Sequence, residues 1–448
     1  MKMGNLKSKL FLLLSVFVCG GTLWAQEEKV LSLTLDKAIE IALADNPTIK
    51  VADEEIALKK TANKEAWQNL LPQASINAAI DHTIKAAEMK LNGMSFKMGQ
   101  DNSNTVNGGL SISLPLFAPT VYKAMSMTRT DIELSLEKSR ASKLDLVNQV
   151  TKAYYQLMLA QDSYKVLQAS YKLTEDNFNV VKAKFDQGKV SEYDKISAEV
   201  QMRSVKPNVI SAGNAVNLAK LQLKVLMGIT EPIELVINDS LDNYEEFLYA
   251  NEVSEDMENN VLANNSTMKQ LDLNVKMLQK NIKTQRMNYI PTLGIGFNYQ
   301  FQSLYNPDFR FLNYAWANSA SVMLNLSIPL YKASNTTKVK TARIQLSQMQ
   351  LNRINTERNL KMQVESYRNN MEASSEQVSS NRENVAQAEK AVDIAGKRYE
   401  VGRGTVLELN SSQVSLTQAQ LTYNQSIYDY LVAKADLDKV LGRDYMKR

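Results

Sequence analysis

Few residues of this chain could carry out covalent or metal chemistry. His82 is the only histidine and Cys19 the only cysteine, so the sequence has no paired-histidine metal motif. Gly93 and Gly99 are too isolated to cradle a phosphate, and their Asn- and Ser-rich surroundings indicate an extracellular loop. A phosphate-binding loop and a nucleophile elbow are also absent from the sequence. We therefore predict a protein without a cofactor, which is not an enzyme.

The first 25 residues have the pattern of a secretory signal. Three lysines precede a short apolar stretch, and Ala25 is a plausible cleavage point. Cys19 follows the bulky Val18, which argues against a lipid anchor at this cysteine. Removal of residues 1–25 takes away three lysines and lowers the net charge from +4 to +1. A nearly neutral secreted chain gives no electrostatic reason to propose nucleic acid as a partner.

The chain contains an internal repeat. Ser113–Phe117 recurs as Ser327–Tyr331, and Phe185–Gly188 recurs at the same offset as Tyr399–Gly402. Each half predicts a helix, two strands separated by a loop, a very long helix, a glycine turn and a returning helix. The predicted organisation is a signal segment (1–25), a first repeat (26–228), a linker (229–260) and a second repeat (261–448).

Two very long helices follow the predicted strands. No glycine or proline occurs from Thr120 to Gln187, which is on the order of 100 Å of helix. Apolar residues follow a 3-4 spacing from Val150 to Phe185, and again from Val364 to Tyr399. This period predicts a coiled-coil seam, in which the apolar residues serve packing and do not bind a cofactor.

Shorter helices surround these long ones. Asn46 is predicted to cap a helix that starts at Pro47. Gly188 and Gly402 are predicted hairpin tips, and the returning helices run over about 191–227 and 405–441. Pro207 and Gly213 lie within the first returning helix, where we expect a kink but no break in the helix.

The predicted strands alternate between apolar and polar residues. The alternation is clear in Leu293–Gln302, Leu324–Ile328 and Leu110–Leu114, and weaker in Ile76–Ile84. A sheet with one apolar and one polar face fits either a soluble sheet packed over a core or an outer-membrane barrel. The secretion signal and the lack of a segment to cover the sheet favour the barrel. Four strands cannot close a barrel alone, so the chain must oligomerise.

In these features the sequence resembles the TolC-like outer-membrane efflux proteins. The resemblance covers Leu33 to Gly442 and rests on the tandem repeat, the Asn46-Pro47 helix start, the two aromatic-x-x-Gly tips and the Gly402–Leu409 stretch. It implies a mixed α and β membrane protein, with a long helical coiled-coil barrel and a homotrimeric transmembrane β-barrel of twelve strands in outer-membrane lipid.

The resemblance also implies partners and a function. The expected role is a passive exit duct of a tripartite efflux or type I secretion system, with its helical tunnel in the periplasm. A periplasmic adaptor would dock at the tips, and an inner-membrane pump of the RND, ABC or MFS type would supply energy. The docking residues implied are Gly188, Lys189, Gly402 and Arg403.

Family members narrow the tunnel entrance with acidic residues on the second returning helix. Glu408, six residues past Gly402, matches the first of these, and Ser411 stands where a second acid is expected. Asp194 is the equivalent of Glu408 in the first half. The resemblance therefore implies a pore constriction at Glu408, Asp194 and Ser411. The alternative is that both carboxylates are solvated helix charges, as most exposed carboxylates are.

A second function class fits part of the pattern. A periplasmic coiled-coil adaptor or scaffold that never enters the membrane would also have long heptad hairpins. Such a protein would not need four alternating strands in two equally spaced pairs, each flanked by helices.

Overall fold

The structure is a computed structural model, which describes residues 30–91, 93–244 and 262–443. The expected signal segment 1–25, with Cys19, lies outside the described residues. The same holds for the part of the 229–260 linker that follows Tyr244.

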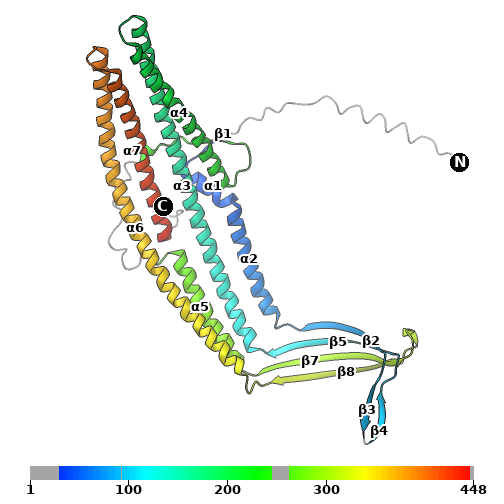
Figure 1. Ribbon diagram of the computed structural model, residues 1–448. Coiled ribbons are helices and arrows are strands. Elements are labelled where there is room, and N and C mark those ends of the chain that lie inside the picture. Colours follow the sequence, from blue (N-terminus) through cyan, green and yellow to red (C-terminus); the bar gives the residue numbers. More distant parts are fainter. Residues whose placement is uncertain (1–29, 92, 245–261, 444–448) are drawn as a thin grey trace, which may run out of the picture.

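Two helices of equal length run along the molecule. α3 (Pro119–Asp186) and α6 (Ala333–Glu400) each contain 68 residues. Each continues through a turn into a helix of 36 residues, α4 (Glu192–Met227) or α7 (Val406–Leu441). Both hairpins have their tips at the same end of the molecule (Figure 1). The equal lengths confirm that the repeat in the sequence is a repeat in the structure.

The seam predicted from the heptad spacing is the packed side of both long helices. Val150, Leu157 and Val378 are fully buried. All other predicted seam residues are buried or partly buried, whereas most of the remaining side chains of α6 are exposed. The seam also accommodates polar residues. Thr174, for example, donates a hydrogen bond from its hydroxyl to the carbonyl of Tyr171 at 2.8 Å.

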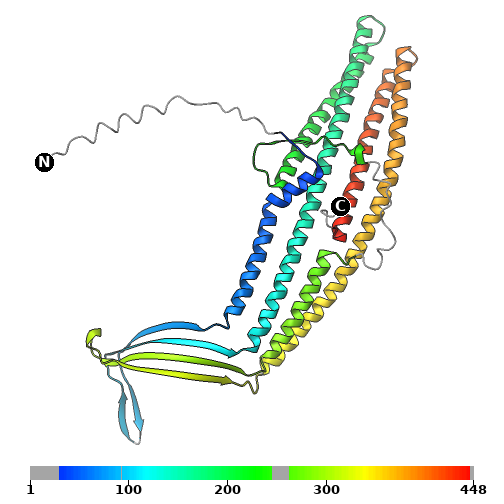
Figure 2. The same cartoon turned by 180° about the vertical axis from the view of Figure 1, so that it is seen from behind.

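The long helices change neighbours halfway along their length. Near the sheet, α3 packs against α2 (Pro47–Gln68) and α5 (Ser266–Met287), and near the tips it packs against α4 and α7. α6 likewise contacts α5 and then α7 (Figure 1, Figure 2). The result is a single curved layer of helices. In the described part of the chain, no helix is long and apolar enough to cross a membrane.

An asparagine joins the shorter helices end to end in each repeat. The amide oxygen of Asn46 accepts from Thr48 N at 2.8 Å and caps α2, while its amide nitrogen donates to Leu226 O at the end of α4 at 2.7 Å. Asn265 similarly accepts from Met268 N at 2.9 Å and donates to Val440 O at 2.7 Å. The predicted cap at Asn46 is confirmed, with a second bond that its position in the sequence did not indicate.

The helix predicted to be interrupted by Pro207 and Gly213 is continuous, because α4 extends through both residues. A Cβ atom added to Gly213 would lie 3.4 Å from Cε2 of Tyr164, so a small residue suits this contact with α3. The expectation that the helix does not break is confirmed.

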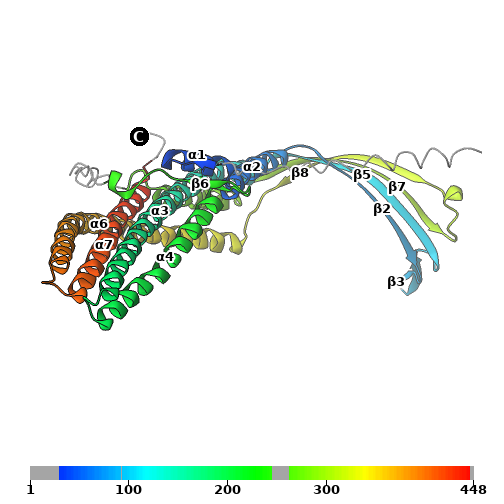
Figure 3. The ribbon, with the colours of Figure 1, turned by 90° about the horizontal axis from the view of Figure 1, so that it is seen from above.

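The four predicted strands form one antiparallel sheet. Its strands are β2 (Gln73–Thr83), β5 (Ser103–Phe117), β7 (Thr292–Asn306) and β8 (Ala317–Ser327), in the order β2-β5-β7-β8. The two repeats therefore meet between β5 and β7. Within the described residues, β2 and β8 are edge strands with one side unpaired. Figure 3 shows that the sheet is curved and lies beyond the ends of the helices.

The loop predicted around Gly93, between β2 and β5, contains two short strands that the sequence analysis did not identify. β3 (Ala87–Leu91) and β4 (Met94–Met98) form an antiparallel hairpin. Apolar and polar residues alternate in both strands, and Met89 lies opposite Phe96. Gly93 has a φ of 84° in the connecting turn, which glycine adopts without strain.

A belt of short elements packs on the helices near the middle of the molecule. β1 (Val30–Ser32) pairs in parallel with β6 (Glu234–Val236), and α1 (Leu35–Asp45) packs against α3. Leu235 and Leu241 are fully buried in the main hydrophobic core, which also includes the middle of α3.

Hydrogen bonds to two aspartates, Asp162 and Asp239, connect this belt to α3. Asp162 of α3 accepts from Leu241 N at 3.0 Å. Asp239 accepts from the hydroxyls of Tyr154 at 3.4 Å and Tyr244 at 2.9 Å. Burial, reinforced by the bond to Asp239, raises the pKa of Tyr244, so its hydroxyl remains a neutral donor.

The asparagine junctions yield a prediction about stability. Asn265→Ala removes the cap of α5 and leaves Val440 O without its donor, so it should destabilise the protein by about 1–2 kcal/mol. Asn265→Asp keeps the cap acceptor but loses the donor, and should also lower the thermal unfolding midpoint of the purified protein. Asn370→Ala, at an exposed position of α6, is the matched control. An Asp variant as stable as wild type would show that only the cap matters.

Candidate functional site: the helical tips and the faces of the sheet

The first tip is a short turn between α3 and α4. Gly188 has a φ of 69°, Gly188 N donates to Phe185 O at 2.8 Å, and Lys189 N donates to Lys184 O at 2.9 Å. Ser191 then caps α4, and the Asp194 carboxylate accepts from Ser191 N at 3.2 Å, which completes a capping box. The glycine therefore ends one helix with a positive φ, and the acidic residue six positions later caps the start of the next helix.

The second tip repeats this geometry. Gly402 has a φ of 73°, and Arg403 N donates to Arg398 O at 2.8 Å. Thr405 caps α7, and the Glu408 carboxylate accepts from Thr405 N at 3.4 Å. No atom lies within 4 Å of a Cβ added to either tip glycine, so only the positive φ, and no steric clash, disfavours larger residues.

The residues expected at the tips lie on the surface of the single chain. Lys189, Arg403 and Ser411 are exposed. Glu408 is exposed too, with Arg398 Nη2 at 3.8 Å from its carboxylate, while Asp194 is half-buried. Within one chain both carboxylates therefore serve as capping groups. A role at a pore constriction remains a prediction.

The two hairpins pack against each other just behind their tips. The contact is a small hydrophobic cluster of Val181, Ala198, Tyr399, Val406 and Leu409, contributed by α3, α4, α6 and α7. This cluster fixes the position of one tip relative to the other.

Tyr399 links this cluster to one of the acidic residues. Its hydroxyl is buried and has no hydrogen-bond partner among the described residues. Burial, together with the negative charge of Asp194, raises the pKa of Tyr399, so the hydroxyl is neutral. Lys184 Nζ lies 4.3 Å from the centre of its ring. The sequence marked Tyr399 as a seam residue but gave no sign of its proximity to Asp194.

One face of the sheet is apolar across all four strands. Ile76 lies opposite Leu110, which lies opposite Tyr299, and the next row joins Ala74, Ile112, Phe297 and Val322. No helix covers this face (Figure 1), and Ile76 is 80% and Val322 69% exposed in the single chain. We call this the apolar face; its larger apolar residues are Ile76, Ile80, Val106, Leu110, Ile112, Leu114, Leu293, Ile295, Phe297, Tyr299, Phe301, Val322, Leu324 and Leu326.

The opposite face of the sheet is small and polar. Ser75 pairs with Ser111, their hydroxyl oxygens 2.7 Å apart, and the row continues to Asn298 and Ser321. We call this the polar face; it includes Gln73, Ser75, Asn77, Asp81, Thr105, Asn107, Ser111, Ser113, Asn298, Gln300, Gln302, Ser319, Ser321 and Asn325. An apolar face towards lipid and a polar face towards water is the arrangement of a transmembrane barrel.

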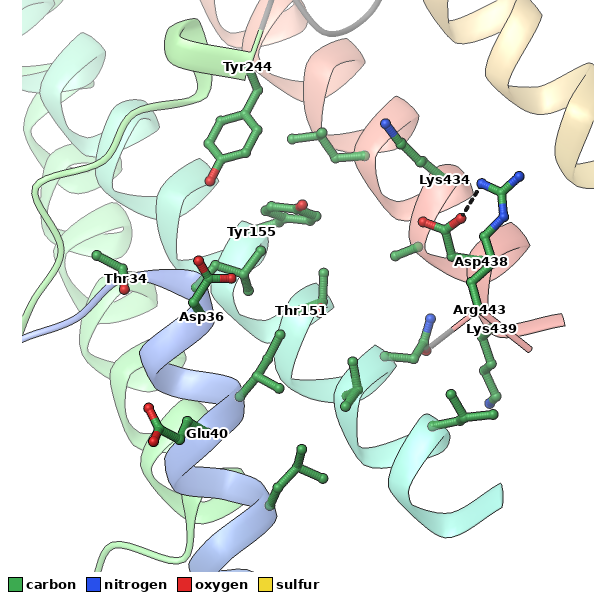
Figure 4. Close-up of a pocket in the computed structure, with 18 of the residues that line it drawn as sticks. Thr34, Asp36, Glu40, Thr151, Tyr155, Tyr244, Lys434, Asp438, Lys439 and Arg443 are labelled. Atoms are coloured by element: carbon green, nitrogen blue, oxygen red, sulfur yellow. Dashed lines mark hydrogen bonds and ion pairs between the residues drawn. The ribbon is translucent and has the colours of Figure 1, made fainter. Parts of the chain in front are cut away.

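A pocket of about 800 Å³ lies between α1, α3 and α7 (Figure 4). Charges of both signs line it, and the Asp438 carboxylate lies 2.9 Å from Arg443 Nη1. Its lining contains no histidine, cysteine or serine. Across the described residues, no group of three or more His, Cys, Asp or Glu side chains could hold a metal ion. The geometry of this pocket does not suggest a catalytic site.

The family model described as outer membrane efflux protein matches residues 38–229 and, a second time, residues 258–443. The chain belongs to this family. It is an outer-membrane exit duct, with its sheet in a transmembrane barrel and its helices in a periplasmic tunnel. Membership decides against the rival interpretation, a periplasmic adaptor outside the membrane. The family is one of passive channels, which agrees with the expectation that the chain is not an enzyme.

Individual relatives match almost the full chain. It is 21% identical to the outer membrane protein TolC of Salmonella enteritidis over 445 residues, which cover 98% of this chain and 87% of TolC. It is 20% identical to the cobalt-zinc-cadmium resistance protein CzcC of Cupriavidus metallidurans over 415 residues, covering 92% and 90% of the two chains.

Solved structures of efflux channels share the fold. The Campylobacter jejuni CmeC outer membrane channel superposes with a TM-score of 0.69 at 17% identity, covering 94% of this chain and 90% of CmeC. The open state of the Neisseria gonorrhoeae MtrE outer membrane channel superposes with a TM-score of 0.71 at 19% identity, covering 91% and 88%. The fold therefore extends over the sheet, the helices and the tips.

The buried hydroxyl at the tips of this efflux protein gives a prediction. Tyr399→Phe removes a buried group without a hydrogen-bond partner, so it should leave the thermal unfolding midpoint unchanged or raise it. Tyr399→Ala should lower stability by about 3–5 kcal/mol, because it opens a cavity between the hairpins. Hydrogen exchange of the tip amides would locate both effects. Loss of protection in the Phe variant would show that the hydroxyl is bonded in the assembled protein.

Proposed function

We propose that three copies of this chain close into one duct that passively carries cargo across the outer membrane. The observation that carries the proposal is the pair of free edges. β2 and β8 lie at opposite edges of the sheet, and their side chains are exposed almost throughout. Unpaired backbone groups are too costly in lipid, so β8 of one copy is expected to pair with β2 of the next. Three copies of four strands give a closed barrel of twelve.

Exposed apolar residues on the helices support the same closure. α4 lies at the edge of the helix layer that continues from β2 (Figure 1), and it exposes Ile196, Val200, Leu221 and Val225. On the opposite side, α6 exposes Ile344, Leu351 and Met362. Large apolar side chains in such numbers on two opposite flanks are typical of an interface that other copies cover. Outer-membrane lipid would cover the apolar face of the sheet.

The tips are the proposed docking site for a periplasmic adaptor. Gly188 and Gly402 give each tip a tight turn, with Lys189 and Arg403 exposed beside them. Equivalent tips in both repeats would present six similar contacts around a trimer. An inner-membrane pump of the RND, ABC or MFS type would deliver the cargo through that adaptor.

The proposed gate uses Asp194 and Glu408. Both lie six residues past a tip glycine, at the starts of α4 and α7. In a trimer these carboxylates would form rings at the tunnel entrance, where they would attract cations and repel anions. Ser411, one turn beyond Glu408, would add a neutral hydroxyl to the same face.

Trimer closure can be tested with proline substitutions in β8. Neighbouring residues of a strand direct their N–H groups to opposite sides, so one of Ala320→Pro and Ser321→Pro removes a donor to β7 and the other removes a donor at the free edge. Both should abolish the detergent-stable trimer on native electrophoresis if the free edge is bonded to another copy. A wild-type protein that stays monomeric and soluble without detergent would overturn the proposal.

The gate can be tested without disturbing the helix starts. Asp194→Asn combined with Glu408→Gln removes both charges, while the amide oxygens can still accept the capping bonds. Reconstituted wild type should conduct cations better than anions, and the double variant should lose most of this preference. The control, Glu192→Gln, neutralises an exposed carboxylate in the same first turn of α4 but on another face. Unchanged selectivity in the double variant would place both carboxylates outside the pore.

A further inference from the structure

Charged side chains are almost absent from the sheet. Asp81 is the only Asp, Glu, Lys or Arg in β2, β5, β7 and β8. The whole chain is 22% charged, so this is a strong local depletion. Contact with lipid accounts for the lack of charge on the apolar face. It does not account for the polar face, because water solvates charges readily.

The register places Asp81 on the polar face. It pairs with Thr105, and the preceding rows of this face contain Ala79 with Asn107 and Asn77 with Gly109. Every other position of the polar face is Ser, Thr, Asn, Gln, Gly, Ala, Met or Pro. The wall on this side therefore offers hydrogen bonds but carries one fixed charge per chain.

Asp81 lies near the end of the sheet that is remote from the helices. β2 starts at Gln73, just after α2, so Asp81 is eight residues or roughly 25 Å further along the strand (Figure 1). Its side chain is exposed, and among the described residues no lysine or arginine forms an ion pair with it. Two ion pairs occur in the segments that connect the strands of the sheet: Lys97 of β4 with Asp101, and Arg310 with Asp308.

We propose that Asp81 sets the charge preference of the outer mouth of the duct, and that the rest of the barrel wall does not discriminate by charge. This inference rests on the proposed trimer, in which three Asp81 carboxylates surround one aqueous passage. The barrel then has one charged zone, at Asp81, and the rest of its polar wall consists mainly of hydroxyl and amide groups. Cationic, anionic and neutral cargo can all pass such a wall without binding to a fixed charge.

Asp81 and the carboxylates at the tips can be distinguished by the side from which a blocking cation is added. Multivalent cations are attracted to carboxylates, and salt screens this attraction beyond about 10 Å at 0.1 M. Hexamminecobalt(III) added on the outer side of a planar lipid bilayer should therefore block through Asp81. In Asp81→Asn, the concentration for half-block from the outer side should rise by about tenfold, the size expected from losing close carboxylates in water. Block from the tip side should stay unchanged.

A relocated carboxylate provides the matched control. Asn107 lies on the polar face one row from Asp81, on the adjacent strand. Asp81→Asn combined with Asn107→Asp should restore outer block, which a merely structural role of Asp81 would not allow. Equal block of wild type and Asp81→Asn from the outer side, or a failed rescue, would overturn the inference. If wild type forms no channel at all, the proposed function itself fails.

Discussion

Backbone hydrogen bonding at the two edges of the sheet is the constraint on which the rest of this structure depends. A single chain leaves β2 and β8 unpaired on one side, and a lipid environment does not tolerate unpaired peptide groups. In the proposed trimer, further copies pair with both edges. β5 leads almost directly into α3, and β8 leads through a short segment into α6, so closing the sheet also sets how the long helices are arranged. In the proposed trimer, the closed barrel of strands would thereby continue as a closed layer of helices.

Because the chain is duplicated, both repeats join the helices near the sheet to the helices near the tips in the same way. α3 and α6 run the full length of the helix layer, whereas α2 meets α4, and α5 meets α7, end to end halfway along it (Figure 1). The junction in each repeat depends on one asparagine, Asn46 or Asn265, which satisfies a helix start and a helix end together. Both are almost fully buried, so water cannot replace the bonds that they make.

At the tips, the same carboxylates have a structural role and a proposed functional one. Asp194 and Glu408 complete capping boxes, which hold each carboxylate at the start of its returning helix. The apolar cluster around Tyr399 holds the two hairpins together just behind these residues. In the proposed gate, an opening movement would have to separate or slide this cluster, while the capping boxes could move intact with their helices.

The sequence by itself determined the long helices and the four strands of the main sheet, because each of these elements has a local pattern. The 3-4 spacing gave the seam from Val150 to Phe185, alternation gave the four strands, and glycine placed both tips. Tertiary structure alone decided that β5 pairs with β7, that β2 and β8 are the free edges, and that Tyr399 lies near Asp194. These facts depend on contacts between residues far apart in the chain, which no local periodicity encodes. The β3–β4 hairpin was missed for another reason: its alternation is short and was outweighed by glycine and asparagine nearby.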